Sequence, residues 1–111
     1  MFNIYLLKSY YNELPIYKIG YTKRRVEDRI KDFKTGNVHD ISIVHIFETD
    51  KYVNSIESTL HREYKFNRIR GEWFELSDID IDTFIVKCKK LYENFKMLEE
   101  TSTYLINKKL K

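Results

Sequence analysis

Two short stretches near the start of the chain, residues 2–8 and 16–22, are rich in β-branched and aromatic side chains. The segment between them carries Asn12 and Pro15, which are residue types that favour turns. Together they predict a β-hairpin, so the fold is expected to start with two antiparallel strands. A chain of 111 residues suits one domain around a single core, and we expect the later elements to complete that domain.

Helices and short strands are predicted to alternate after the hairpin. Apolar residues at helical spacing predict a helix over residues 24–35, with a stop at Gly36 and Asn37. Alternating side chains predict a third strand over residues 41–48. Asp50 is then expected to cap a second helix that runs to about Tyr64.

The remaining chain is predicted to form a basic loop over residues 67–71, a short extended stretch over residues 72–76, and a last helix that starts at Ser77. One apolar stripe follows this helix: Phe84, Cys88, Leu91, Phe95 and Leu98. The stripe predicts docking on the sheet, and the alternative is a homodimer formed through the same helix.

The predicted fold class is therefore α+β, with a small, mainly antiparallel three-stranded sheet flanked by helices and followed by an amphipathic C-terminal helix. Residues 1–100 are expected to form the single domain. Thr101-Ser102-Thr103 interrupts the apolar pattern, so residues 101–111 are predicted to be a basic, mobile tail.

Composition excludes some functions and leaves others open. No stretch approaches the roughly 20 apolar residues of a membrane helix, so no membrane partner is expected. The single cysteine, Cys88, cannot form an internal disulfide, and residues 1–5 do not read as the basic region and apolar run of a secretory signal. We expect a cytoplasmic or other reducing intracellular location. The net charge of +3 permits a polyanionic partner without requiring one.

Glu57 is the strongest candidate for chemistry. Val53, Ile56 and Leu60 repeat at helical spacing, and Glu57 falls within that stripe rather than opposite it. An unpaired carboxylate on a core-facing side would cost several kcal/mol by order of magnitude. The position therefore predicts a cation, a hydrogen-bond network or a metal ion as its partner.

Several short motifs in this order resemble the GIY-YIG nuclease superfamily. Asn3-Ile4-Tyr5 and Lys18-Ile19-Gly20 stand where that family has its two tripeptides, and Arg29 and Glu57 stand at its helical arginine and glutamate. The resemblance is more specific to a phage and viral branch whose second motif reads Lys-Ile-Gly. It extends over residues 2–76 and includes these segments: Tyr17–Thr22, Asp28–Gly36, Glu57–His61 and Gly71–Phe74.

The resemblance implies a divalent-metal-dependent DNA endonuclease or nickase, within a host cell if the chain is viral. It implies that Glu57 holds Mg²⁺ or Mn²⁺ and that Arg29 stabilises the charge of the transition state. Tyr5 would position or deprotonate the attacking water. Lys18 stands where the family has a tyrosine, and it would assist electrostatically. His61, one helical turn after Glu57, would orient the carboxylate or protonate the leaving oxygen.

Each of these positions also has a purely structural interpretation. Arg29 and Glu57 could form a salt bridge between two helices, and Tyr5 or His61 could be ordinary packed residues. Trp73 could stack on a base, but its strand position favours a core role. The lysine in the second motif leaves open a DNA-binding or protein-interaction module without efficient catalysis, and a regulatory protein on the same fold is a third reading.

Two basic clusters are the candidate contacts to a nucleic-acid backbone. The residues are Lys23, Arg24, Arg25, Arg68 and Arg70. Acidic residues are interspersed with the first cluster, which weakens its field. No separate base-reading module is present in this sequence, so low sequence specificity is expected for a DNA partner.

Overall fold

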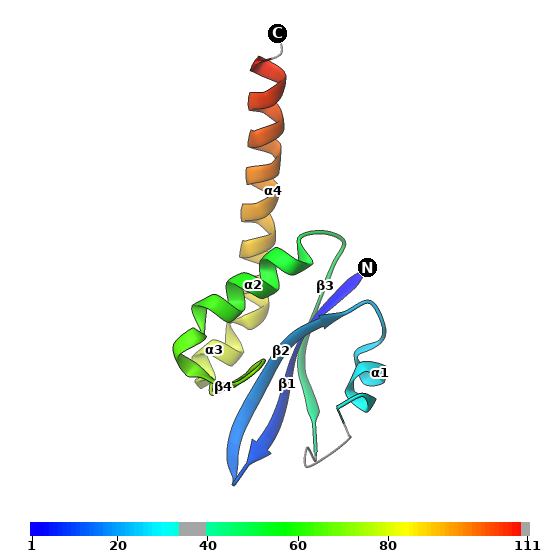
Figure 1. The fold of residues 1–111 in the computed structure, drawn as a ribbon, viewed down its shortest axis with the longest axis vertical. Helices are drawn as coiled ribbons and strands as arrows, with labels where there is room; N and C mark the ends of the chain where they lie inside the picture. The colour runs from blue at the N-terminus through cyan, green and yellow to red at the C-terminus, as the bar shows by residue number, and fades with distance from the viewer. Residues whose placement is uncertain (34–39, 110–111) are drawn as a thin grey trace.

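A five-stranded antiparallel sheet forms the centre of the computed structural model, which describes residues 1–33 and 40–109 (Figure 1). The strands lie in the order β3-β1-β2-β5-β4. Their bounds are Phe2–Tyr11 for β1, Leu14–Thr22 for β2, Ser42–Thr49 for β3, Arg68–Arg70 for β4 and Trp73–Phe74 for β5. The predicted fold class is confirmed, with five strands instead of three.

The predicted hairpin is present, and its strands are longer than expected. Strand β1 pairs with β2 from Asn3 opposite Thr22 to Tyr11 opposite Leu14. The turn consists of Asn12 and Glu13, both with positive φ, at 49° and 68°. Two residues with positive φ give a hairpin turn whose twist matches that of the strands. The predicted turn over residues 9–15 is therefore reduced to two residues.

The two faces of the sheet have separate cores because side chains alternate along a strand. Ile4 and Leu6 of β1 face one side, in a cluster with helices α2 (Val53–Glu63) and α4 (Phe84–Lys109). Tyr5 and Leu7 face the other side, where they pack on Val26 and Ile30 of helix α1 (Val26–Lys31). Helix α1 has only 6 residues, so it covers a small part of its face of the sheet.

Helix α1 is shorter than the predicted helix over residues 24–35, and the predicted stop at Gly36 and Asn37 lies outside the described residues. The predicted cap of the second helix was wrong, because the N-cap of α2 is Tyr52 and no side chain caps it. Asp50 instead accepts a hydrogen bond from the hydroxyl of Tyr92 at 2.9 Å. This hydrogen bond connects α4 to the segment just before α2.

The predicted loop over residues 67–71 was also wrong in part. A short 3-10 turn, η1 (Lys65–Asn67), leads into β4, which pairs with β5 across Gly71. Strand β5 then pairs with β2, with Lys18 opposite Trp73. This addition to the hairpin brings the β4–β5 turn to the edge of β2.

Ser77 starts a helix as predicted, through a capping box in which its hydroxyl accepts from the Asp80 N–H and the Asp80 carboxylate accepts from the Ser77 N–H. However, the predicted single helix is two helices, α3 (Asp78–Asp82) and α4, separated at Thr83.

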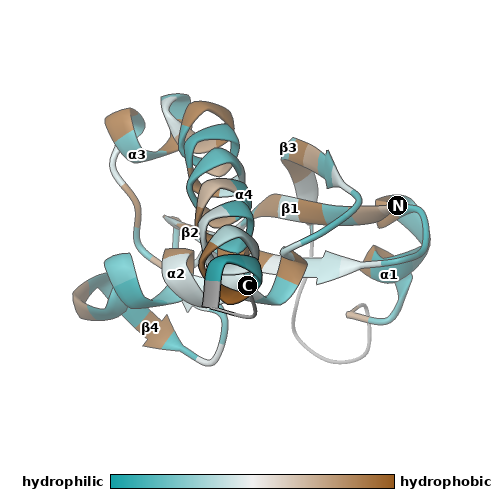
Figure 2. Ribbon diagram, turned by 90° about the horizontal axis from the view of Figure 1, so that it is seen from above, coloured by the Kyte–Doolittle hydropathy of each residue, from teal (hydrophilic) through white to brown (hydrophobic). Residues whose placement is uncertain are grey.

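Helix α4 packs its first turns on the core through Phe84 and Cys88, and its distal half stands away from the rest of the molecule (Figures 1 and 2). Residues 101–109 continue this helix, and the mobility of the tail stays a prediction, as does dimerisation. In the described part of the chain, no helix combines the length and apolarity needed to cross a membrane.

Candidate functional site

The side chain of Tyr5 lies across the backbone of Gly20, its partner on the neighbouring strand. A Cβ atom at residue 20 would lie 2.4 Å from the Tyr5 hydroxyl oxygen, so only glycine leaves room for the phenol. The ring is almost fully buried. Burial raises the pKa of Tyr5 to about 12, and the charge of Glu72 acts in the same direction, whereas Arg29 lowers it.

Arg29 is the half-buried cation beside this phenol, and it reaches there from α1. Its guanidinium hydrogen-bonds to Tyr5, pairs with Asp32 at 3.0 Å, and lies 4.5 Å from the ring centre of Phe33. Asp32 thus takes the place of Glu57, the partner considered from the sequence. Three contacts on different sides hold the guanidinium next to the Tyr5 hydroxyl.

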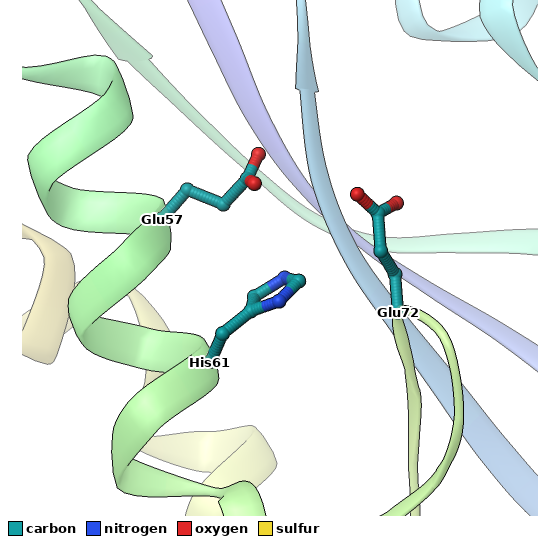
Figure 3. A group of neighbouring side chains, drawn as sticks. All are labelled: Glu57, His61 and Glu72. Carbon is teal, nitrogen blue, oxygen red and sulfur yellow. The ribbon is translucent and has the colours of Figure 1, made fainter.

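Glu57 and His61 project from the same side of α2, because they are four residues apart. Glu72 faces them from the turn between β4 and β5, and Figure 3 shows the three side chains directed towards one another. One potential ligand atom from each residue lies within 4.8 Å of those of the other two. Two carboxylates and an imidazole at this spacing form a candidate metal centre.

Sequence reasoning missed Glu72 as a member of this group. The residue lay in a quoted motif, Gly71–Phe74, but its role depends on how the β4–β5 turn docks on β2. That docking is fixed by a backbone hydrogen bond from the Ile19 N–H to the Glu72 carbonyl, at 3.2 Å. Proximity to Glu57 arises only once the sheet is assembled.

The ring of His61 is held by two contacts. Its Nε2 lies 2.8 Å from the Ile19 carbonyl oxygen, and the ring meets Phe74 edge-on at 5.1 Å between centres. A carbonyl oxygen can only accept, so Nε2 carries the proton and Nδ1 keeps a lone pair. A backbone carbonyl that fixes the tautomer in this way is a common support for a metal-binding or proton-accepting histidine.

Glu57 is half-buried, and burial raises its pKa from 4.5 to about 7, with a further contribution from the charge of Glu72. Both causes disfavour the ionised form. A divalent cation between the two carboxylates would reverse this effect, because it supplies the positive charge that the site lacks. The two carboxylates therefore fit Mg²⁺ or Mn²⁺, which bind through one or two carboxylates and fill the other positions with water and substrate oxygens.

Lys18 lies between the carboxylates and an aromatic surface. Its Nζ is 3.7 Å from Glu72, 4.2 Å from the ring centre of Phe33 and 5.4 Å from that of Trp73. Alternation along β2 places Lys18 on the same face as Tyr5, two residues from Gly20. The structure thus brings together five of the predicted site residues and adds Glu72: Tyr5, Lys18, Arg29, Glu57 and His61.

The basic side chains that are predicted to contact a nucleic-acid backbone differ in whether they already have a partner within the protein. In the first cluster, Arg24 pairs with Asp32 and Arg25 with Glu27, while the Lys23 ammonium lies over the Phe2 ring. In the second cluster, Arg68 and Arg70 are exposed on β4, next to the turn that carries Glu72. Contact of these residues with nucleic acid stays a prediction.

Comparison with known proteins gives one match. Residues 3–90 match the model of the T5orf172 domain, which is well over half of the chain and extends from β1 into α4. That domain is associated with a phage, nuclease-like fold related to GIY-YIG proteins. No curated protein and no solved structure matches the chain.

Proposed function

Because the chain belongs to the T5orf172 domain family, we propose that it is a divalent-metal-dependent endonuclease or nickase that hydrolyses phosphodiester bonds in DNA. The observation that carries the proposal is the convergence of Arg29 and Glu57 on the Tyr5 phenol, from three elements that are far apart in the sequence. A buried phenol, a fixed guanidinium and a carboxylate next to a candidate metal centre together suit hydrolysis of a phosphodiester.

Glu57 would hold the metal ion, with Glu72 and His61 within reach of the same point. When bound, Mg²⁺ or Mn²⁺ supplies Lewis-acid polarisation of a phosphate oxygen. The carboxylates of Glu57 and Glu72 would together hold the ion in place.

The other side chains act on the phosphate and on water. Arg29, already fixed by Asp32, donates hydrogen bonds to non-bridging oxygens as their charge grows. Tyr5 orients the attacking water through its hydroxyl group. Only the ionised phenol could take a proton from that water, and because burial holds the pKa of Tyr5 at about 12, this ionisation depends on the charge of Arg29. Lys18 contacts the phosphate as a point charge. The leaving oxygen takes its proton from water, because the Nε2 proton of His61 is held by the Ile19 carbonyl.

The test is conversion of supercoiled plasmid to open-circle or linear DNA with Mg²⁺ or Mn²⁺. The expected result is cutting by the unmodified chain and none by Glu57→Ala or after chelation. Glu93→Gln, an exposed change on α4, is the matched control and should cut normally. Equal circular dichroism spectra would establish that the variants are folded. Equal background from all proteins would contradict the proposal.

A second candidate function is a DNA-binding or protein-interaction module without efficient catalysis. The observation that favours it is the position of Lys18, whose ammonium already faces Glu72 at 3.7 Å. A module of this kind would bind DNA equally well with and without metal. A regulatory protein on the same fold would instead form a protein complex that is insensitive to changes at Glu57 and Arg29.

A further inference from the structure

We propose that an open groove beside Trp73 binds unpaired nucleobases of the DNA strand whose phosphates reach the candidate site. This inference rests on the proposed nuclease function and specifies its substrate as DNA with single-stranded nucleotides. The groove has a volume of about 460 Å³, which is within the range of about 300–1,000 Å³ typical of small-molecule sites. The residues that carry the argument are Tyr11, Ile16, Ile69, Arg70 and Trp73.

The groove lies on the same face of the sheet as Tyr5 and Lys18. Lys18 is directly opposite Trp73, and alternation along β2 places Ile16 on that face as well. Helix α1, of 6 residues, packs on Tyr5 and Leu7 through Val26 and Ile30. Towards the tip of the hairpin, the strands continue past this short helix, and the groove occupies that end of the face.

The lining of the groove matches a nucleotide in two respects. Tyr11 is 64% exposed and Ile69 is 46% exposed, so flat apolar surface is available for stacking. Arg70 is the charged member of the lining residues that the structure describes, and its charge is positive. Aromatic rings next to an arginine suit a base and its phosphate. A strongly basic peptide would be repelled by the charge of Arg70.

Trp73 connects the groove to the candidate site. Its ring lines the groove and lies 5.4 Å from the Lys18 ammonium, which is 3.7 Å from Glu72. A strand with a phosphate at Lys18 would therefore place neighbouring nucleotides at Trp73. Bases inside a continuous duplex are stacked and paired, and they cannot enter the groove without extrusion. Flaps, frayed ends and gaps would be preferred over intact duplex.

The experiment uses the fluorescence of Trp73, which is the one tryptophan of the chain. The full chain in chelator, where no cleavage occurs, is titrated with an oligothymidine of about a dozen nucleotides and, separately, with a blunt duplex at the same salt. The expected result is saturable quenching by the single strand and little quenching by the duplex. Tyr11→Ala should weaken the single-strand affinity about tenfold.

Tyr104→Ala is the matched control, because Tyr104 is as exposed as Tyr11 but lies on the distal part of α4. It should bind as the unmodified chain does. Absence of quenching, equal quenching by duplex, or an unchanged affinity of Tyr11→Ala would overturn the inference.

The two proposals can fail separately. Metal-dependent plasmid cutting without quenching by single strands would refute the groove and leave the nuclease function standing. Quenching that depends on Tyr11, in a chain that cuts no DNA, would refute the nuclease function and leave the groove standing.

Discussion

Replacing Glu57 by glutamine should stabilise the metal-free protein at alkaline pH. The folded state raises the pKa of Glu57 from 4.5 to about 7, by burial and by the charge of Glu72. The folded protein thus holds this proton more tightly than the unfolded chain does. The corresponding stability is fully present below about pH 4.5 and is lost as the pH rises through about 7.

The magnitude follows from the size of this shift. At about 1.36 kcal/mol per pKa unit, the whole pKa shift of Glu57 would correspond to about 3 kcal/mol in the free energy of unfolding. Solvent screening of a half-buried site reduces the expected free energy to about 1–2 kcal/mol. For a small domain, such a difference moves the melting temperature by several degrees, at about 4–8 °C per kcal/mol.

The assay is urea unfolding of the unmodified chain and of Glu57→Gln, in chelator, at about pH 5 and about pH 8. The variant should be the more stable protein at the higher pH, and the gap should shrink at the lower pH. Mg²⁺ or Mn²⁺ should stabilise the unmodified chain more than the variant. Glu48→Gln, an exposed change on β3, is the control. A gap that does not vary with pH would refute the reasoning.

Three further predictions concern Gly20, Lys18 and Ser77. Gly20→Ala should lower the free energy of unfolding in urea by about 1–3 kcal/mol and reduce plasmid cutting, because the added Cβ would lie 2.4 Å from the buried Tyr5 hydroxyl oxygen. Unchanged stability would contradict this packing. Lys18→Met should weaken DNA binding and reduce the salt dependence by roughly one phosphate contact, as measured by fluorescence anisotropy at several salt concentrations; an unchanged slope would place Lys18 away from the backbone. Ser77→Ala should cost about 1 kcal/mol by removing the hydroxyl that accepts from the Asp80 N–H, with no change in DNA binding, and thermal unfolding would check it.

The parts of the fold that could be predicted are those with a local signal. The hairpin and the helix around Glu57 follow from periodicity within a few residues. Strand β4 could not be found in this way, because Arg68, Ile69 and Arg70 are all exposed. The polar-apolar-polar order of these 3 residues is too short to establish a strand period. They form a strand because β5 pairs with them. The break between α3 and α4 at Thr83 was also missed, since the apolar stripe starts only at the following residue.

In the candidate site, too, some residues have a local signal in the sequence, whereas others come together only in the folded structure. Glu57 stood out because a carboxylate lies within an apolar stripe. Glu72 did not, because its approach to Glu57 requires the β4–β5 turn to dock on β2. The pair of Arg29 and Asp32 did have a local signal, the spacing of three residues along a helix. That spacing could have been weighed against the longer-range pair with Glu57.

Helix α4 has the proportions of a lever. At 1.5 Å per residue, its 26 residues make a rod about 39 Å long. Its base packs on α2, the helix that bears Glu57 and His61 (Figure 1), and the Tyr92–Asp50 hydrogen bond braces the contact. A tilt of about 10° around Phe95, which still packs on the core, would carry the end of the helix, about 21 Å further on, by about 4 Å. Conversely, a partner that binds the distal end of α4 and displaces it would exert a torque on α2, the helix that holds two of the candidate metal ligands.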